Sequence, residues 1–151
     1  MNTSFSIALK YGLYITASLI TYFLILRLFN LHENPWLRLF NGVFMSSGIY
    51  FAIKYYKLMS DKNFSYINGA KTALVTGFVA TVLFTVFMAI YMFHIDVAFT
   101  KKLLGDWLSD YEAGANILLF IIFVEGLAST VVLALAFMQL FKNSRNIPQN
   151  R

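Results

Sequence analysis

One carboxylate inside a long apolar segment is the side chain most able to do chemistry in this sequence. Residues 114–141 are apolar almost throughout and carry Glu125 near their middle. A helix over this range is about 42 Å long at roughly 1.5 Å per residue, which exceeds the roughly 30 Å hydrocarbon core of a bilayer. Because ionisable groups inside a bilayer are costly and often mark functional sites, Glu125 is the first candidate residue.

The expected surroundings of Glu125 are hydroxyl groups. It lies about 16 Å from the outer start of its helix, and counting the same depth on the neighbouring spans predicts an intramembrane polar layer. The members of this layer are Glu125, Ser129, Ser46, Ser47, Thr81 and Thr85. On a helical wheel, Glu125 shares its side with Gly114, Ala128, Ser129, Val132, Ala136 and Gln139, whereas Phe120, Phe123, Leu127, Phe137 and Phe141 lie opposite. We therefore expect Glu125 to face protein.

Three roles remain open for Glu125. It can be a protonated group that joins helices by hydrogen bonds, an ion or proton site, or a contact with a transmembrane helix of a partner. The basic residue inside the first span, Arg27, lies roughly 12 Å above Glu125 along the axis, so hydroxyl groups are the expected partners. We favour the structural role, with the carboxyl protonated much of the time.

Other catalytic or ligand-binding patterns are weak. His32 and His94 fall at outer helix ends, near Glu33 and Asp96, but without the i, i+3 or i, i+4 pairing of a helical metal site. The sequence has no cysteine and no zinc-protease, phosphate-loop or nucleophile-elbow motif. We expect no enzyme activity, no cofactor and no metal.

Composition indicates an integral membrane protein. Hydrophobic residues make up 59% of the 151 residues and charged residues 13%, where soluble domains carry about 25% charged. The predicted fold is all-α: one four-helix transmembrane domain over 1–151, with spans at about 11–29, 36–57, 66–93 and 114–141. Of the twelve lysines and arginines, eight lie on the side of the two termini, and only Arg27, Arg38, Lys101 and Lys102 lie on the other side, so the positive-inside rule places both termini in the cytoplasm. The net charge of +5 is thus read as orienting charge, not as a nucleic-acid surface.

Local signals set the predicted helix starts. Asn34 is a cap before Pro35 and Trp36, and Ser65 is a cap before the third span. The first ten residues are expected to form a short head.

Two further segments offer packing surfaces. In the third span small residues recur at every fourth position, which lets helix backbones approach closely in lipid. They are Gly69, Ala73, Gly77, Thr81, Thr85 and Ala89. Residues 97–111 show apolar side chains at helical spacing and predict a short amphipathic helix on the membrane surface between the third and fourth spans. The stripe can pack inside the chain or bind a second subunit, and the amphipathic segment can rest on lipid or dock a partner.

Several short motifs resemble a known family. They are Lys10-Tyr11-Gly12-Leu13, the segment from Met59 to Lys71 leading into Gly77, and the segment from Tyr91 to Asp96. In these motifs and in layout the chain resembles a family of small bacterial four-span membrane proteins catalogued as a domain of unknown function. The resemblance implies a multi-pass protein of the bacterial cytoplasmic (inner) membrane and supplies no activity or ligand.

The functional expectation is a non-catalytic accessory or assembly subunit of a larger membrane complex, with the lipid bilayer and a protein partner or further copies as its contacts. The alternative is a small oligomeric transporter or channel for ions or protons that uses Glu125.

Overall fold

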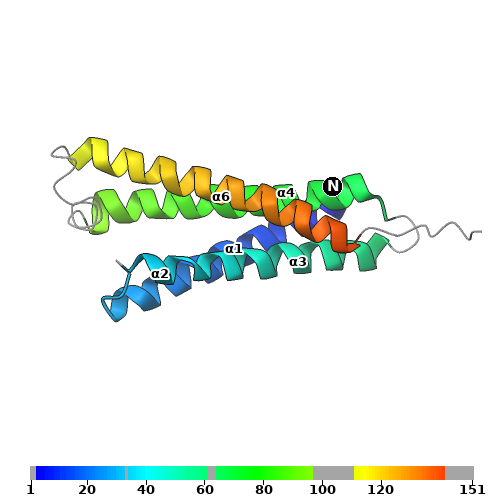
Figure 1. The fold of residues 1–151 in the computed structure, drawn as a ribbon, viewed down its shortest axis with the longest axis horizontal. Helices are drawn as coiled ribbons and strands as arrows, with labels where there is room; N and C mark the ends of the chain where they lie inside the picture. The colour runs from blue at the N-terminus through cyan, green and yellow to red at the C-terminus, as the bar shows by residue number, and fades with distance from the viewer. Residues whose placement is uncertain (1–2, 33, 61–63, 97–110, 142–151) are drawn as a thin grey trace, which may run out of the picture.

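The computed structural model describes residues 3–32, 34–60, 64–96 and 111–141, and these residues form helices without any strand. The elements in chain order are α1 (Thr3–Leu28), α2 (Pro35–Arg38), α3 (Phe40–Ser60), α4 (Tyr66–Ile90), the π-helical turn η2 (Tyr91–Ile95) and α6 (Tyr111–Phe141). The four long helices α1, α3, α4 and α6 lie alongside one another, with α2 prolonging α3 and η2 prolonging α4 (Figure 1). The predicted all-α class is confirmed for the described residues.

Three helical segments are long and apolar enough to cross a membrane: Ser4–Leu28, Tyr66–Ile95 and Gly114–Phe141. The fourth long helix, α3, has a less apolar sequence, because serines, glycines, tyrosines and the lysines Lys54 and Lys57 interrupt its hydrophobic residues. The membrane character expected from composition is therefore supported by three helices, and the predicted second span is not among them.

The helix α1 begins at Thr3, so the prediction of a non-helical head over the first ten residues is wrong. Ile7 and Ala8 are buried, and the hydroxyls of Ser4 and Thr72 lie 2.7 Å apart, joining the first turn of α1 to α4. Tertiary contacts of this kind extend a helix beyond the stretch that its apolar pattern marks.

A tight turn joins α1 to α2. Asn30 has a positive φ of 55°, and the Leu31 N–H donates to the Leu26 carbonyl at 2.9 Å. This is the left-handed termination that asparagine tolerates after a helix. Four residues later the predicted cap is confirmed, since the Asn34 side chain accepts a hydrogen bond from the Trp36 N–H at 3.0 Å and Pro35 occupies the first helical position.

The helix α4 starts at Tyr66, as expected for the third span. Ser65 occupies the predicted cap position but makes no side-chain capping hydrogen bond. At the other end α4 passes into η2, where the Asp96 N–H donates to the Tyr91 carbonyl at 2.9 Å. The Tyr91 hydroxyl donates to the Asp96 carboxylate at 3.1 Å, which closes this turn. The predicted amphipathic helix over 97–111 falls, except for Tyr111, outside the described residues.

Small residues set the distance between α4 and α6. A side chain at Gly77 would overlap Thr130, and a Cβ at Gly126 would lie 2.6 Å from the Cγ2 atom of Thr81. Each helix thus gives a glycine to receive a threonine of the other. Gly69, Ala73, Gly77 and Thr81 are all buried, so this part of the predicted stripe packs within the chain.

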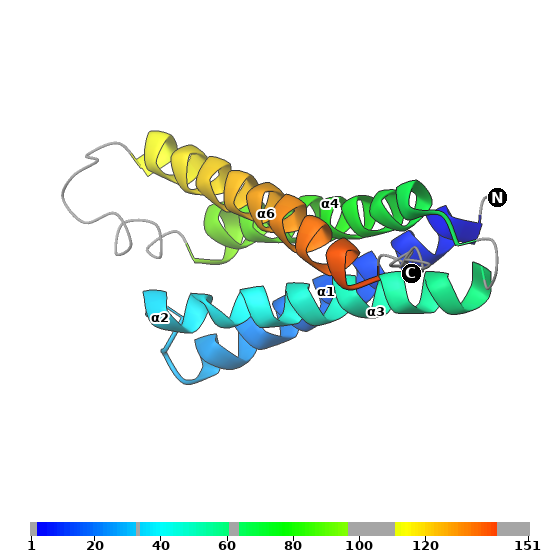
Figure 2. The same ribbon diagram turned by 45° about the vertical axis from the view of Figure 1, so that its right-hand side comes forward.

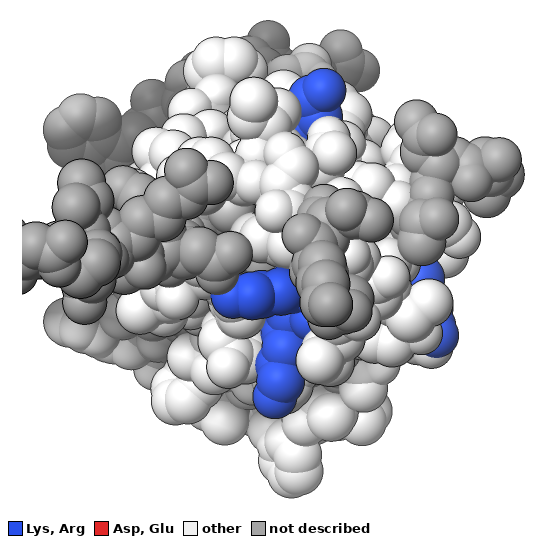
Figure 3. Space-filling view, turned by 90° about the vertical axis from the view of Figure 1, so that its right-hand side faces the viewer, with Lys and Arg blue, Asp and Glu red and all other residues white. Residues whose placement is uncertain are grey.

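The helices α3 and α6 converge at one end and separate at the other (Figure 2). Where they converge, the Tyr50 ring lies 5.6 Å from Phe137 and 5.4 Å from Phe141, measured between ring centroids, and the Lys57 ammonium donates to the Phe141 carbonyl at 3.3 Å. Basic side chains are visible at this end of the molecule, and no described Asp or Glu is seen on that face (Figure 3). The separation at the opposite end creates the candidate site.

Candidate functional site

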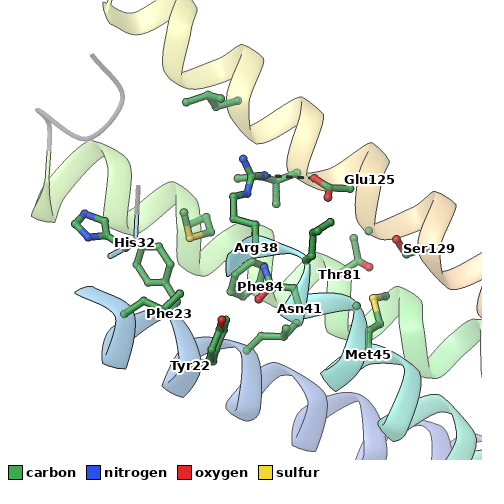
Figure 4. A pocket seen from close by; sticks show the side chains of 18 of the residues that line it. Tyr22, Phe23, His32, Arg38, Asn41, Met45, Thr81, Phe84, Glu125 and Ser129 are labelled. Carbon is green, nitrogen blue, oxygen red and sulfur yellow. Dashed lines mark hydrogen bonds and ion pairs between the residues drawn. The ribbon is translucent and has the colours of Figure 1, made fainter. Parts of the chain in front are cut away.

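A cavity of about 220 Å³ opens between the four long helices at the end where α3 and α6 separate (Figure 4). The helices α1, α3, α4 and α6 all contribute to its lining, together with His32 and Leu39 from the turns, Arg38 of α2 and Met92 of η2. The residues from the long helices are Leu19, Tyr22, Phe23 and Leu26 (α1); Asn41, Gly42 and Met45 (α3); Thr81, Phe84 and Met88 (α4); and Leu118, Ile122, Glu125, Gly126 and Ser129 (α6). Most of these side chains are apolar, and the polar groups are few.

Glu125 lines this cavity and is paired with Arg38, because the arginine Nη2 atom lies 3.3 Å from its Oε2 atom. The side chains are 60% exposed for Glu125 and 36% for Arg38. The expectation that hydroxyl groups are the partners of Glu125 is therefore wrong for this structure. Its partner is a cation from a different helix, and the carboxylate lies at an edge of the bundle.

Two local features hold Arg38 in place. The Asn34 cap fixes the start of α2, and the Tyr22 hydroxyl donates to the Leu37 carbonyl at 2.9 Å, which ties α2 to α1. The break at Leu39 separates α2 from α3, so the predicted continuous span over 36–57 is divided. These contacts allow the Arg38 side chain to reach across the separated ends toward α6.

Sequence reasoning missed Arg38 because it was counted among the orienting cations at a helix end. The signal that could have found it is its position. Arg38 lies inside the predicted span over 36–57, and a cation inside a span is costly unless another group compensates it, as Glu125 does here.

The predicted polar layer is only partly assembled. Glu125, Thr81 and Ser129 line the cavity, whereas Ser46, Ser47 and Thr85 do not. The Ser47 hydroxyl donates to the Phe44 carbonyl of its own helix at 2.9 Å. The buried hydroxyls of Thr81 and Thr85 have no hydrogen-bond partner among the described residues.

The stripe on α4 changes character along its length. It is buried as far as Thr81, while Thr85 and Ala89 are half-buried. The part of the stripe from Gly69 to Thr81 therefore belongs to the α4–α6 contact. Thr81 alone among the stripe residues lines the cavity.

The two histidines differ. His32 is 8% exposed and lines the cavity, with its ring 6.0 Å from Phe23, whereas His94 is exposed. Arg27 lies with its guanidinium 5.0 Å from the centre of the Tyr91 ring. Within the described ranges, no three His, Cys, Asp or Glu side chains come together as metal ligands.

One side of α6 is left uncovered by the rest of the described chain. We define the α6 seam as Glu125, Ala128, Val132, Ala136 and Gln139, which follow one another at intervals of three, four, four and three residues and are all exposed. This is the side that the helical wheel predicted to face protein. Within one chain that prediction is wrong for the α6 seam, although Gly114 is buried and Ser129 is half-buried at the cavity. The buried contacts of α6 include Leu118, Thr130, Ala134 and Met138.

Comparisons with known proteins leave this site to be interpreted from its geometry. No protein-family model matches the chain, and neither a curated protein nor a solved structure does.

Proposed function

We propose that this protein is a non-catalytic, multi-pass membrane subunit that binds a transmembrane helix of another protein along the α6 seam. The observation that carries the proposal is the row of small and polar residues that the seam forms within an exposed face whose other members, such as Val131 and Leu135, are large and apolar. A helix face that meets only lipid gains nothing from small or polar side chains, whereas helix–helix contacts in membranes favour them. In the α6 seam, Ala128 and Ala136 lie between the carboxylate of Glu125 and the amide of Gln139. The seam is on the least buried of the three candidate spans, since 17% of the most apolar stretch of Gly114–Phe141 is buried, against 33% for Tyr66–Ile95.

The spacing of the seam supports a helical partner. Intervals of three and four residues keep side chains on one side of a helix, as in paired helices. Ala128 and Ala136 permit close approach of a second backbone, and the Gln139 amide can exchange hydrogen bonds with a polar side chain of that helix. The partner helix should therefore carry small residues with serine, threonine or asparagine among them.

In the proposed topology four helices cross the bacterial inner membrane, with both termini in the cytoplasm. The lysines Lys54 and Lys57 near the end of α3, with Lys10 and Lys71, then follow the positive-inside rule. The contact between Lys57 and the Phe141 carbonyl sets the inner ends of α3 and α6 at one level. Glu125 would lie about 24 Å above Phe141, in the outer half of the roughly 30 Å core.

A transporter or channel that uses Glu125 has less support. Its carboxylate is paired with Arg38. The helices α4 and α6 are in close contact through Gly126 and Thr81 in the cavity wall, and through Gly77 and Thr130 toward the other end of the bundle. A conduction path through one copy would have to open these contacts.

The test is native extraction in a mild detergent, followed by sizing and identification of the complex. Wild-type protein should migrate with a different integral membrane protein, and the substitution Ala128→Leu combined with Ala136→Leu should release it. Val43→Leu is the control, because Val43 is 60% exposed on α3, away from the seam. A homo-oligomer of this chain alone, or a complex indifferent to the seam variants, would overturn the proposal.

A further inference from the structure

The cavity at the separated end of the bundle has an opening on its side. Three of its lining residues are exposed, namely Leu39 and Gly42 beside the start of α3 and Glu125 on α6. They mark the opening between α3 and α6. In a membrane such an opening faces the bilayer laterally, so the molecules that reach it first are lipids.

The interior of the cavity is mostly apolar. Its buried lining includes Leu19, Phe23, Met45, Met88 and Leu118, which come from four different helices. At about 220 Å³ the cavity is larger than the roughly 150 Å³ engineered cavities that take up benzene, and smaller than pockets for whole drug-sized ligands, which begin near 300 Å³. It fits one alkyl chain, and the polar part of an amphiphile must stay at the opening.

The opening carries charges of both signs. The ion pair uses one N–H of the Arg38 guanidinium and one oxygen of Glu125. A guanidinium has five donors in a plane suited to phosphate or carboxylate, so most of those of Arg38 remain available. The second carboxylate oxygen of Glu125 is available to an ammonium group. A head group that carries an anion and a cation close together satisfies both residues.

A third polar group points to an ester-linked chain. Thr81 is 4% exposed and lines the cavity, and its hydroxyl has no hydrogen-bond partner among the described residues. A buried hydroxyl without a partner is unfavourable, so an acceptor supplied from inside the cavity would stabilise it. Thr81 packs against Gly126, next to Glu125 in α6, which places its hydroxyl near the head-group end of the cavity.

We propose that this cavity binds a single alkyl chain of a phosphoethanolamine amphiphile, which enters from the bilayer between α3 and α6. The phosphate binds Arg38, the ammonium binds Glu125, and the ester carbonyl accepts a hydrogen bond from Thr81. The site shares Glu125 with the proposed partner surface, but the other residues of the α6 seam do not line the cavity.

The experiment uses the full chain purified in dodecyl maltoside, with single-chain phosphatidylethanolamine as the probe and its occupancy measured by native mass spectrometry. Single-chain phosphatidylglycerol, which has the phosphate but no ammonium, is the comparison, and phosphoethanolamine without a chain is the negative control. Wild-type protein should bind the ethanolamine lipid at least five-fold more tightly than the glycerol lipid, and the chainless compound not detectably.

Variants test each contact. Arg38→Gln should weaken binding of both lipids at least ten-fold, whereas Arg27→Gln, a cation loss at the same end but outside the cavity, should leave it unchanged. Glu125→Gln should reduce the preference for ethanolamine over glycerol to about one. Gly42→Leu should block the chain, since a Cβ there meets no atom within 4 Å and the fold can accept it.

Thr81→Val separates a ligand contact from a structural role. Removing a hydroxyl without a partner should leave the unliganded chain as heat-stable as wild type or more so, while the lipid binds a few-fold more weakly. Equal affinity of wild type, Arg38→Gln and Gly42→Leu for the ethanolamine lipid would overturn the proposal, as would unchanged head-group preference in Glu125→Gln. Ala128→Leu with Ala136→Leu should retain lipid binding, so failure of the partner surface and failure of the lipid site are told apart.

Discussion

Replacing Gly77 by alanine tests the packing that shapes the bundle. A Cβ at this position would overlap the Cγ2 and Oγ1 atoms of Thr130 and lie 2.8 Å from its Cβ. Thr130 cannot move aside without cost, because its hydroxyl donates to the Gly126 carbonyl at 2.8 Å and the residue is 2% exposed. The helices α4 and α6 must therefore separate or Thr130 must give up its hydrogen bond.

Three free-energy terms set the size of the effect. Alanine gains about 0.5–1 kcal/mol over glycine inside a helix. Overpacking a well-filled contact costs about 1–3 kcal/mol, and loss of the Thr130 hydrogen bond costs about 0.5–1.5 kcal/mol. We expect Gly77→Ala to lower the free energy of unfolding by about 1–3 kcal/mol.

Gly42→Ala is the matched control, because it has the same helix-propensity gain and no atom within 4 Å of the added Cβ. It should raise the free energy of unfolding by about 0.5–1 kcal/mol. Unfolding in mixed dodecyl sulfate micelles, followed by helical circular dichroism, measures both variants. If Gly77→Ala is as stable as Gly42→Ala, the close contact of α4 with α6 is refuted.

Three further predictions address local structure and topology. Asn34→Ala should lower the free energy of unfolding by about 0.5–2 kcal/mol, because the capping bond to Trp36 is lost; unchanged stability in the same micelle titration would contradict the cap. Asn30→Ala should be destabilising by about 1–2 kcal/mol because of the positive φ, whereas Asn30→Gly should be nearly neutral, and equal stability of the two would contradict this backbone conformation. Because the chain has no cysteine, Leu31→Cys and Lys57→Cys can be labelled singly in intact cells with a membrane-impermeant maleimide: Leu31→Cys should react and Lys57→Cys should not, and the reverse pattern would invert the proposed topology.

The positions of the helices could largely be predicted from local sequence, since apolar length and the Asn34-Pro35 start act over a few residues. The start of α1 could not, because helix formation before residue 11 depends on contacts such as that of Ser4 with Thr72, far away in the chain. The π-helical turn after Ile90 likewise left no mark that the apolar pattern could reveal.

The candidate site divides in the same way. Glu125 stands out in any reading of the sequence, because a carboxylate is rare in an apolar helix. Its partner depends on how far α3 and α6 separate and on the break at Leu39, which depth counting on parallel helices ignores. The wheel groups Glu125 with the small residues of α6, but which neighbour covers that face is decided by packing, and the described helices of this chain leave the α6 seam exposed.

The most direct test of the proposed function is photo-crosslinking from the centre of the α6 seam in living cells. A photoreactive amino acid at Val132 should give an adduct with a different membrane protein, whereas the same group at Val43, which is 60% exposed where Val132 is 64%, should give none. Adducts of similar yield from both positions, or an adduct of Val132 only with further copies of this chain, would contradict a subunit that binds its partner through α6.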